Sequence, residues 1–314
     1  MTAPVEPDRP RTLYRGRFAP SPTGPLHLGS LYTALAGFLH AKHQGGEWLL
    51  RIDDLDPHRT LPDSADRIRY ALEACHLFWD EPVLYQSGRA EAYRAALDRL
   101  EAAGVLYPCS CSRKDLAHAA ENAAPFTVYP GFCRRRRIRS EQGSHSLRII
   151  TEGIRISFDD RLQGPAGQDL ETEVGDFVLF RRDEVYAYHL ATVLDDAEQG
   201  ITEVLRGRDL LDSTPRQIYL QQQLGLPRPA YSHIPILVDE CGLKLSKQTF
   251  APEATVQDPG PLLFRLLVLL KQSPPPELAS AGAKEILDWA IPNWEISRLQ
   301  GLSSLPAAAL QFPL

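Results

Sequence analysis

The stretch RFAPSPTGPLHLGSLYTALA, residues 17–36, decides the fold. Its first residues continue a short run that predicts a strand, and its prolines and glycines then form a polar elbow. From about residue 28 to residue 43 the pattern is helical, and one face carries Leu28, Leu31, Leu35 and Leu39. A second strand is expected in EWLLRIDDLD, residues 47–56. A strand, a helix and a strand within residues 13–52 predict a βαβ unit and a parallel α/β sheet.

The elbow contains the residue types of an anion site. In open α/β sheets, ligands bind at the carboxyl ends of strands, where helix N-termini offer unpaired N–H groups and the positive end of the helix dipole. Gly24 and Gly29 allow a ligand to approach the backbone, while Pro20 and Pro22 stiffen the turn. His27 either donates a hydrogen bond to a phosphate oxygen or caps the helix. The stretch matches neither G-x-G-x-x-G nor G-x-x-x-x-G-K-[ST], which excludes the dinucleotide fingerprint and the P-loop.

Composition describes an ordinary globular chain of 314 residues with a net charge of −6. That charge argues against a general nucleic-acid coat, but arginines are concentrated in CRRRRIR, residues 133–139, and between residues 9 and 17. Each basic segment is either a solvated surface or a contact with nucleic acid. We find no signal peptide and no bilayer span, so we expect a cytoplasmic protein without a membrane partner. The five cysteines are then expected to be thiols or metal ligands.

The pattern of apolar and turn residues divides the chain into four segments. Residues 13–106 hold the βαβ unit and two amphipathic helices, SADRIRYALEACHLF and AEAYRAALDRLEAAG. Residues 107–175 are predicted to form an inserted subdomain, with short β-like runs such as HSLRII and IRISF. Residues 176–250 return to regular structure, with a helix in STPRQIYLQQQLG and a strand in YSHIPILVD. Residues 251–314 are mostly helical in pattern, with proline breaks.

A second motif, KLSKQ at residues 244–248, places two lysines on a glycine-flanked loop. Mobile ammonium groups can stabilise a pyrophosphate leaving group in the transition state, although a solvated loop is the alternative for this motif by itself. HLGS at residues 27–30 and KLSKQ together resemble the two signature motifs of class I aminoacyl-tRNA synthetases.

The intervening residues narrow this resemblance. LRIDDLDPHR, YAYHLATVLDD and VLRGRDLL are similar to glutamyl-tRNA synthetases in order and spacing, from about Arg17 to Gln248. Three departures resemble the glutamyl-Q tRNA(Asp) synthetase family, a truncated paralogue: the few residues after the lysine loop, the cysteines of the insertion, and the glutamine that ends KLSKQ. The resemblance implies a Rossmann-like class I synthetase catalytic domain with a zinc-containing inserted subdomain, a short helical C-terminal segment and no anticodon-binding domain.

The resemblance also implies an activity. Members of that family activate L-glutamate with ATP and transfer it to the queuosine base at the wobble position of tRNA(Asp), and Mg²⁺ accompanies the ATP. Glutamate, ATP and that tRNA are therefore the expected partners of a protein that we expect to be a monomer. Three alternatives stay open: a truncated glutamyl-tRNA synthetase charging tRNA(Glu), a ligase for a non-RNA acceptor, and a non-catalytic tRNA-binding regulatory paralogue.

The resemblance implies site residues position by position. Arg17 and Arg206 would each pair with one carboxylate of glutamate, and Tyr188 and Ser21 would help to hold the substrate. Asp53 stands where the family has a glutamate that meets the amino group, so the ammonium sits closer, a water bridges, or binding is weaker. The implied ATP site is His27, Gly29, Ser30 and Lys247, and the implied catalytic residues are His27, Lys244 and Lys247.

The insertion contains a metal-ligand pattern. A Cys-x-Cys pair is followed by Tyr-x-x-x-Cys, which offers three thiolates and one phenolate, and Zn²⁺ suits three cysteines with a fourth ligand. The resemblance implies one structural zinc ion held by Cys109, Cys111, Tyr129 and Cys133. Cys75 and Cys241 are interpreted as buried or incidental.

Three aspartates after the second predicted strand offer another cation site. Asp53, Asp54 and Asp56 form either a Mg²⁺ cluster or a loop that Asp54 and Asp56 cap and order, and we prefer the second interpretation.

Overall fold

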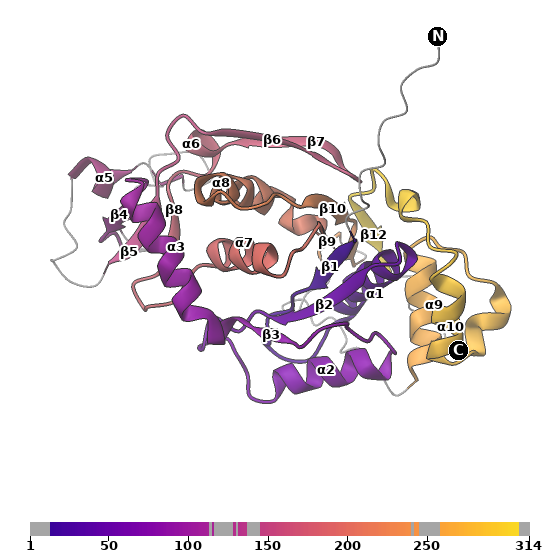
Figure 1. Ribbon diagram of the computed structural model, residues 1–314. Coiled ribbons are helices and arrows are strands. Elements are labelled where there is room, and N and C mark those ends of the chain that lie inside the picture. Colours follow the sequence, from indigo (N-terminus) through magenta and orange to yellow (C-terminus); the bar gives the residue numbers. More distant parts are fainter. Residues whose placement is uncertain are drawn as a thin grey trace, which may run out of the picture.

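The computed structural model of the protein describes residues 13–112, 115, 128–129, 131–136, 145–239, 242–244 and 258–307 (Figure 1). The βαβ unit predicted from residues 13–52 is present. Strand β1 (Arg15–Phe18) and strand β2 (Glu47–Ile52) lie parallel, joined through helix α1 (Leu28–His43). Helix α1 is buried on most of its faces, because its small and aliphatic residues pack on the sheet on one side and on the C-terminal helices on the other.

Residues 13–106 and residues 176–239 both contribute parallel strands. On one side β3 (Leu84–Tyr85) pairs with β2, and the connecting elements are α2 (Ser64–Ala74), η1 (Gln86–Arg89) and α3 (Ala90–Ala102). On the other side β9 (Glu203–Gly207) runs beside β1, since the Thr202 N–H donates to the Arg15 carbonyl at 3.0 Å. Strand β10 (Ala230–Ile234) pairs parallel to β9, and the accompanying elements are α7 (Tyr188–Glu198), η2 (Arg208–Ser213) and α8 (Thr214–Leu224).

The segment between the two halves forms antiparallel structure. A three-stranded sheet has the order β4 (Leu106–Cys109), β5 (Ser146–Ile149) and β8 (Phe177–Phe180). A separate hairpin consists of β6 (Arg155–Asp160) and β7 (Gly164–Asp169), and the short helices are α5 (Phe132–Arg136) and α6 (Leu170–Glu173). In Figure 1, α5, β4 and β5 form the end of the molecule opposite α9 and α10, while the hairpin lies over α8.

The C-terminal elements pack against α1 and β2. They are α9 (Pro259–Leu269), η4 (Pro276–Ser280), α10 (Ala283–Ala290), η5 (Ile296–Leu299) and β12 (Ser304–Pro306). Strand β12 pairs parallel to β11 (Ile236–Val238), and the apolar faces of α9 and α10 share one core with α1 and β2. Strand β11 shares this core and also lines a cavity. The C-terminal elements therefore support one wall of that cavity.

The expected elements are present, and three of them differ in their bounds. The strand expected over residues 47–56 ends at Ile52. The strand expected in YSHIPILVD is two strands, β10 and β11, separated by Pro235, which has no N–H to donate to a sheet. The helix expected from residue 64 to residue 78 ends at Ala74, where His76 adopts a left-handed φ of 57°. The four segment boundaries stay a prediction. Within the described ranges, no helix is long and apolar enough to cross a membrane.

Candidate functional site

A cavity of about 200 Å³ lies where the elbow, α1, β9 and β11 meet. Its wall includes Arg17, His27, Gly29, Ser30, Tyr188, Arg206 and Lys244, all of which are predicted site residues. The cavity therefore joins the elbow to the beginning of KLSKQ, as the two-motif interpretation requires. Ser21 and Asp53 do not line it, and Lys247 lies outside the described residues.

His27 is the N-cap residue of α1. Its Nδ1 accepts a hydrogen bond from the Ser30 N–H at 3.2 Å, and its Nε2 lies 3.0 Å from the Ser30 hydroxyl. The capping role that the sequence left open is thus present. Because Nδ1 accepts, the ring proton of a neutral His27 is on Nε2, where the Ser30 hydroxyl can accept it. Gly29 and Ser30, in the first turn of α1, face the same cavity.

Arg17 is buried, and the carboxylate of Asp196 holds its guanidinium in place. Its Nε and Nη2 donate to the two carboxylate oxygens of Asp196 at 3.1 and 3.3 Å. Asp196 also accepts from Arg51 Nη1 at 2.5 Å, so one buried carboxylate lies between two guanidiniums. Burial opposes the charge of Asp196, but the two arginines outweigh it and lower the pKa of that carboxyl. Among the described residues, Arg17 Nη1 has no protein partner, which leaves it for a ligand in the cavity.

Asp53 lies behind the cavity wall, at the end of β2. Its carboxylate accepts from Arg51 Nε at 2.8 Å, and its N–H donates to the Pro20 carbonyl of the elbow. Burial raises the pKa of Asp53 to about 6, although the neighbouring Arg51 partly offsets this effect. Its role toward the substrate amino group therefore stays a prediction. Ser21 is exposed in the elbow, where its carbonyl accepts from the Thr23 N–H at 2.8 Å.

Arg206 reaches the cavity from β9. Its Nε donates to His233 Nε2 at 3.0 Å, and its Nη2 donates to the Thr214 hydroxyl at 2.8 Å and to the Leu210 carbonyl at 3.2 Å. Its Nη1 is buried and has no hydrogen-bond partner in the described part of the chain. A guanidinium that is fixed on two nitrogens and open on the third is suited to bind a carboxylate.

Two further predicted residues lie at the mouth of the cavity. Lys244 Nζ contacts the Asp209 carboxylate at 2.5 Å, and both residues line the cavity. Tyr188, the first residue of α7, also lines it and keeps 37% of its surface exposed. A hydroxyl and an ammonium group are thus accessible from solvent at the point where a substrate would enter.

The aspartates after β2 order their loop, as the preferred interpretation predicted. Asp54 accepts from the N–H and the hydroxyl of Ser87 at 2.8 and 2.6 Å. Asp56 accepts from the His58 N–H at 3.1 Å and from Arg181 at 2.7 Å. These carboxylates accept hydrogen bonds from donors of the protein, as the loop interpretation predicts.

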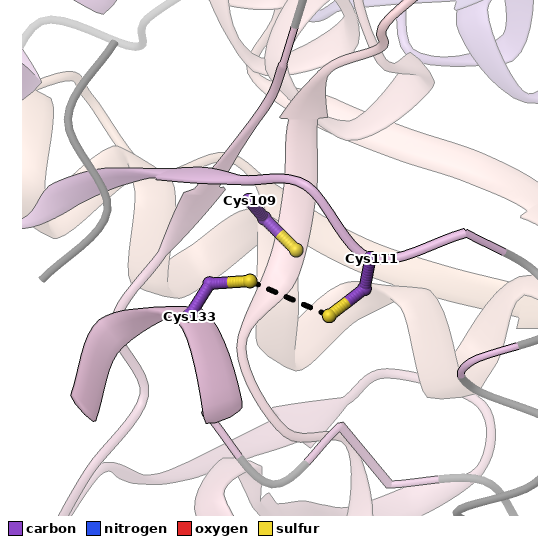
Figure 2. Close-up of side chains that lie close together, drawn as sticks. All are labelled: Cys109, Cys111 and Cys133. Atoms are coloured by element: carbon purple, nitrogen blue, oxygen red, sulfur yellow. Dashed lines mark hydrogen bonds between the residues drawn. The ribbon is translucent and has the colours of Figure 1, made fainter. Parts of the chain in front are cut away.

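The cysteines of the insertion come together as Figure 2 shows. The sulfurs of Cys109, Cys111 and Cys133 all lie within 4.8 Å of one another, with 3.4 Å between those of Cys111 and Cys133. Zn–S bonds of about 2.3 Å in a tetrahedron separate sulfurs by about 3.8 Å, so the arrangement suits such an ion. The Tyr129 hydroxyl lies 3.3 Å from the Cys109 sulfur and 3.6 Å from that of Cys111. The four predicted ligand atoms therefore converge.

The electrostatics of this cluster support one ionised thiol. Burial opposes ionisation of Cys133, but hydrogen bonds from Tyr129, Cys111 and Ser110 outweigh it and lower its pKa to about 6. Burial raises the pKa of Cys111 to about 11, and burial also raises that of the Tyr129 hydroxyl. The Arg148 guanidinium lies 3.9 Å from the centre of the Tyr129 ring, which brings positive charge to a group that a metal would deprotonate. By contrast, Cys75 is buried in the apolar core, as expected.

Sequence reasoning missed the buried partners that hold the two arginines. Asp196 orients Arg17, and His233 contacts Arg206. Their sequence signal is a polar residue inside an apolar element, in YAYHLATVLDD and in YSHIPILVD. Such residues must be paired when buried, but which partner they find depends on tertiary structure.

The comparisons with known proteins agree with this geometry. Residues 14–270 match the family model of the class I tRNA synthetases (E and Q), catalytic domain. A glutamyl-Q tRNA(Asp) synthetase from Methylococcus capsulatus is 55% identical over 290 residues, covering 92% of this chain and 94% of that protein. Another from Chromobacterium violaceum is 48% identical over 302 residues, covering 96% and 98%.

Solved structures show the same architecture. The crystal structure of a glutamate tRNA ligase from Elizabethkingia meningosepticum, in complex with its amino acid, superimposes with a TM-score of 0.79 at 25% identity. The superposition covers 95% of this chain and 68% of that one. The fold, the cavity and the matched domain define a ligase of the class I aminoacyl-tRNA synthetase type. Within that class, the chain belongs to the glutamyl-Q tRNA(Asp) synthetase family.

Proposed function

We propose that the protein activates L-glutamate with ATP and transfers the glutamyl group to the queuosine base at the wobble position of tRNA(Asp). The observation that carries the proposal is that Arg17, Arg206, His27 and Lys244 line one cavity. Two guanidiniums suit a dicarboxylic amino acid, while a helix N-terminus and an ammonium group suit polyphosphate. The names of the relatives supply the acceptor tRNA.

In the first step, a carboxylate oxygen of glutamate attacks the α-phosphorus of ATP. A P–O bond forms, the bond to the β-phosphate breaks, and pyrophosphate leaves with the electron pair. This chemistry needs little proton transfer, so positioning and charge stabilisation account for the rate. Arg206 and Arg17 would hold the two carboxylates of glutamate, one of which reacts, and Tyr188 would contact the substrate at the mouth of the cavity.

The elbow and the lysine loop would act on the phosphates. His27 Nε2, Gly29 and Ser30 lie at the N-terminus of α1, where the helix dipole favours a negative charge. Lys244 already lies on the cavity wall, and Lys247 would follow it toward the leaving pyrophosphate. When bound with ATP, Mg²⁺ supplies further positive charge to the phosphate oxygens.

In the second step, a hydroxyl of queuosine attacks the carbonyl carbon of glutamyl-adenylate. The new ester bond forms, AMP leaves as an anion, and the hydroxyl proton passes to solvent. Cys109, Cys111, Tyr129 and Cys133 would hold a structural zinc ion that keeps the shape of the insertion. The arginines of α5 are adjacent to that cluster and would contact the tRNA backbone. A tRNA substrate supports a cytoplasmic location for the reaction.

The test offers labelled glutamate and ATP with two pools of tRNA, one normal and one from cells that cannot make queuosine. Label in the normal pool alone is the expected result. Equal label in both pools would instead make the protein a glutamyl-tRNA synthetase that charges tRNA(Glu). A folded protein without glutamate-dependent exchange between ATP and pyrophosphate would favour the non-catalytic alternative.

A further inference from the structure

We propose that His233, held by Asp160, is a positioning residue that orients the Arg206 guanidinium toward a carboxylate of glutamate. The inference rests on the proposed function, because it takes Arg206 as a ligand of the amino acid. Two hydrogen bonds link three side chains from three strands: Asp160 on β6, His233 on β10 and Arg206 on β9.

The hydrogen bonds determine the tautomer of His233. An arginine Nε–H can only donate, so His233 Nε2, 3.0 Å away, must accept. The ring proton is therefore on Nδ1, and it is donated to Asp160 Oδ2 at 2.5 Å. The other oxygen of Asp160 accepts three backbone N–H groups, those of Leu162, Gln163 and His233, at 3.0, 2.9 and 3.2 Å. Asp160 is thus fully engaged, and its second oxygen fixes the plane and the tautomer of the imidazole.

This arrangement leaves one nitrogen of Arg206 for a substrate. His233 takes Nε, while Thr214 and Leu210 take Nη2, and Nη1 is buried without a partner in the described part of the chain. Arg206 lines the cavity, so a carboxylate that binds there can satisfy Nη1. The bond to His233 fixes the guanidinium at Nε, and the bonds to Thr214 and Leu210 fix it at Nη2.

Holding the backbone explains the burial of Asp160, but it does not explain why an imidazole is buried beside it. The side chains of Asp160 and His233 are fully buried, and burying a carboxylate and an imidazole costs more free energy than burying apolar residues of the same size. The buried network is therefore expected to serve the residue at its end, which is the one that faces the cavity.

The neutral state of His233 is essential to the geometry. Protonation of Nε2 would place an N–H against the Nε–H of Arg206, and the guanidinium would have to move. The charged and titratable groups that face His233 are Asp160 from β6, Arg206 from β9, Asp209 from η2 and the stacked Tyr231 on its own strand. Burial, reinforced by Arg206, lowers the pKa of His233 below its usual value despite the opposing aspartates, so the neutral form predominates at neutral pH.

The test measures glutamate-dependent exchange between ATP and pyrophosphate for the full chain, from pH 5.5 to pH 8. His233→Gln keeps an oxygen acceptor near Nε2 and cannot titrate, whereas His233→Leu has no acceptor. His40→Gln is the matched control, because His40 is a buried histidine that contacts Glu203 and Trp294 rather than Arg206.

We expect His233→Leu to raise the KM for glutamate by roughly 10- to 100-fold, with the KM for ATP nearly unchanged. His233→Gln should keep a KM for glutamate close to that of the wild type at pH 8. As the pH falls, the KM of the wild type should rise because His233 becomes protonated, and this rise should be smaller in His233→Gln, which cannot titrate. If His233→Leu does not fold, the pH profiles of the wild type and of His233→Gln still test the positioning role of His233.

Three results would overturn the inference: a wild-type KM for glutamate in His233→Leu, an equal rise in His40→Gln, or a pH profile of His233→Gln that matches the wild type. In each of these cases the wild-type enzyme still shows glutamate-dependent exchange, so the proposed function stands. If the wild type itself shows no such exchange, the proposed function fails, and the positioning role fails with it.

Discussion

Arg17, on β1, donates two hydrogen bonds to Asp196, on α7, so a residue of the first half of the catalytic region is oriented by a helix of the second half. Asp196 binds Arg51 as well, which makes it the shared counter-ion of two buried guanidiniums. The packing of α7 against the parallel strands and the geometry of the cavity therefore depend on the same carboxylate.

Replacing this counter-ion should destabilise the fold strongly. In Asp196→Asn, Arg17 and Arg51 lose a buried negative charge, and breaking a buried ion pair costs roughly 3–5 kcal/mol of unfolding free energy. Urea denaturation at pH 7 measures the loss. Asp66→Asn is the control, because the Asp66 side chain is 75% exposed in its pair with Arg69, and its replacement should cost no more than about 0.5 kcal/mol. Equal losses in the two variants would show that Asp196 is not the counter-ion we infer.

Asp53 should make the wild type less stable as the pH rises. Its pKa, raised to about 6 mainly by burial, lies above the value of 3.8 expected in the unfolded chain. A carboxyl with a raised pKa contributes stability that is fully present below pH 4 and is lost as the pH rises to 6. Two pKa units correspond to at most about 3 kcal/mol. Asp53→Asn removes the titrating group. As the pH rises from 4 to 6, the unfolding free energy of this variant should therefore increase relative to that of the wild type. Parallel curves for the two proteins would contradict this assignment.

The fold could be predicted because its decisive signals are local. The helical spacing of Leu28, Leu31 and Leu35 after a proline-rich elbow predicted α1, and α1 between two short strands predicted the parallel pairing. Two of the errors in element bounds occurred where a single residue, Pro235 or His76, stops a regular pattern. Both residues can be read in the sequence, but the apolar pattern continues beyond each of them, and that pattern predicts a longer strand or helix.

The site could be predicted only in part. Seven residues predicted from the resemblance line one cavity, because the motifs that hold them are short and locally ordered. The buried partners could not be predicted, since Asp196 and His233 meet their arginines only after distant strands and helices pack together. The position of Asp53 shows the same limit: its side chain turns to Arg51, two residues before it, rather than to the cavity.

The cysteine cluster should bind one zinc ion per chain. Removal of the ion with a chelator should loosen the part of the insertion around β4 and α5, because Tyr107, Cys109, Tyr129 and Cys133 form the small local core of that part. Cys133→Ser should lose the ion, and Tyr129→Phe should bind it more weakly because one of four ligands is missing. Metal analysis of the purified protein measures the content. Cys75→Ala should keep a full complement, since Cys75 lies in the main core. Full zinc in Cys133→Ser would exclude the site.

Lys244 should act on the rate rather than on the binding of glutamate. Its ammonium group pairs with Asp209 on the wall of the cavity that Arg17 and the N-terminus of α1 also line. Lys244→Ala should lower the kcat of adenylate formation by on the order of 10- to 100-fold, because a positive charge that stabilises the leaving pyrophosphate is lost. The KM for glutamate should stay near the wild-type value, and Lys247→Ala should lower kcat further still. Lys284→Ala, on the exposed face of α10 with 73% of its side chain in solvent, should leave both parameters unchanged. A rise in the KM for glutamate at constant kcat would instead place Lys244 among the residues that bind the amino acid.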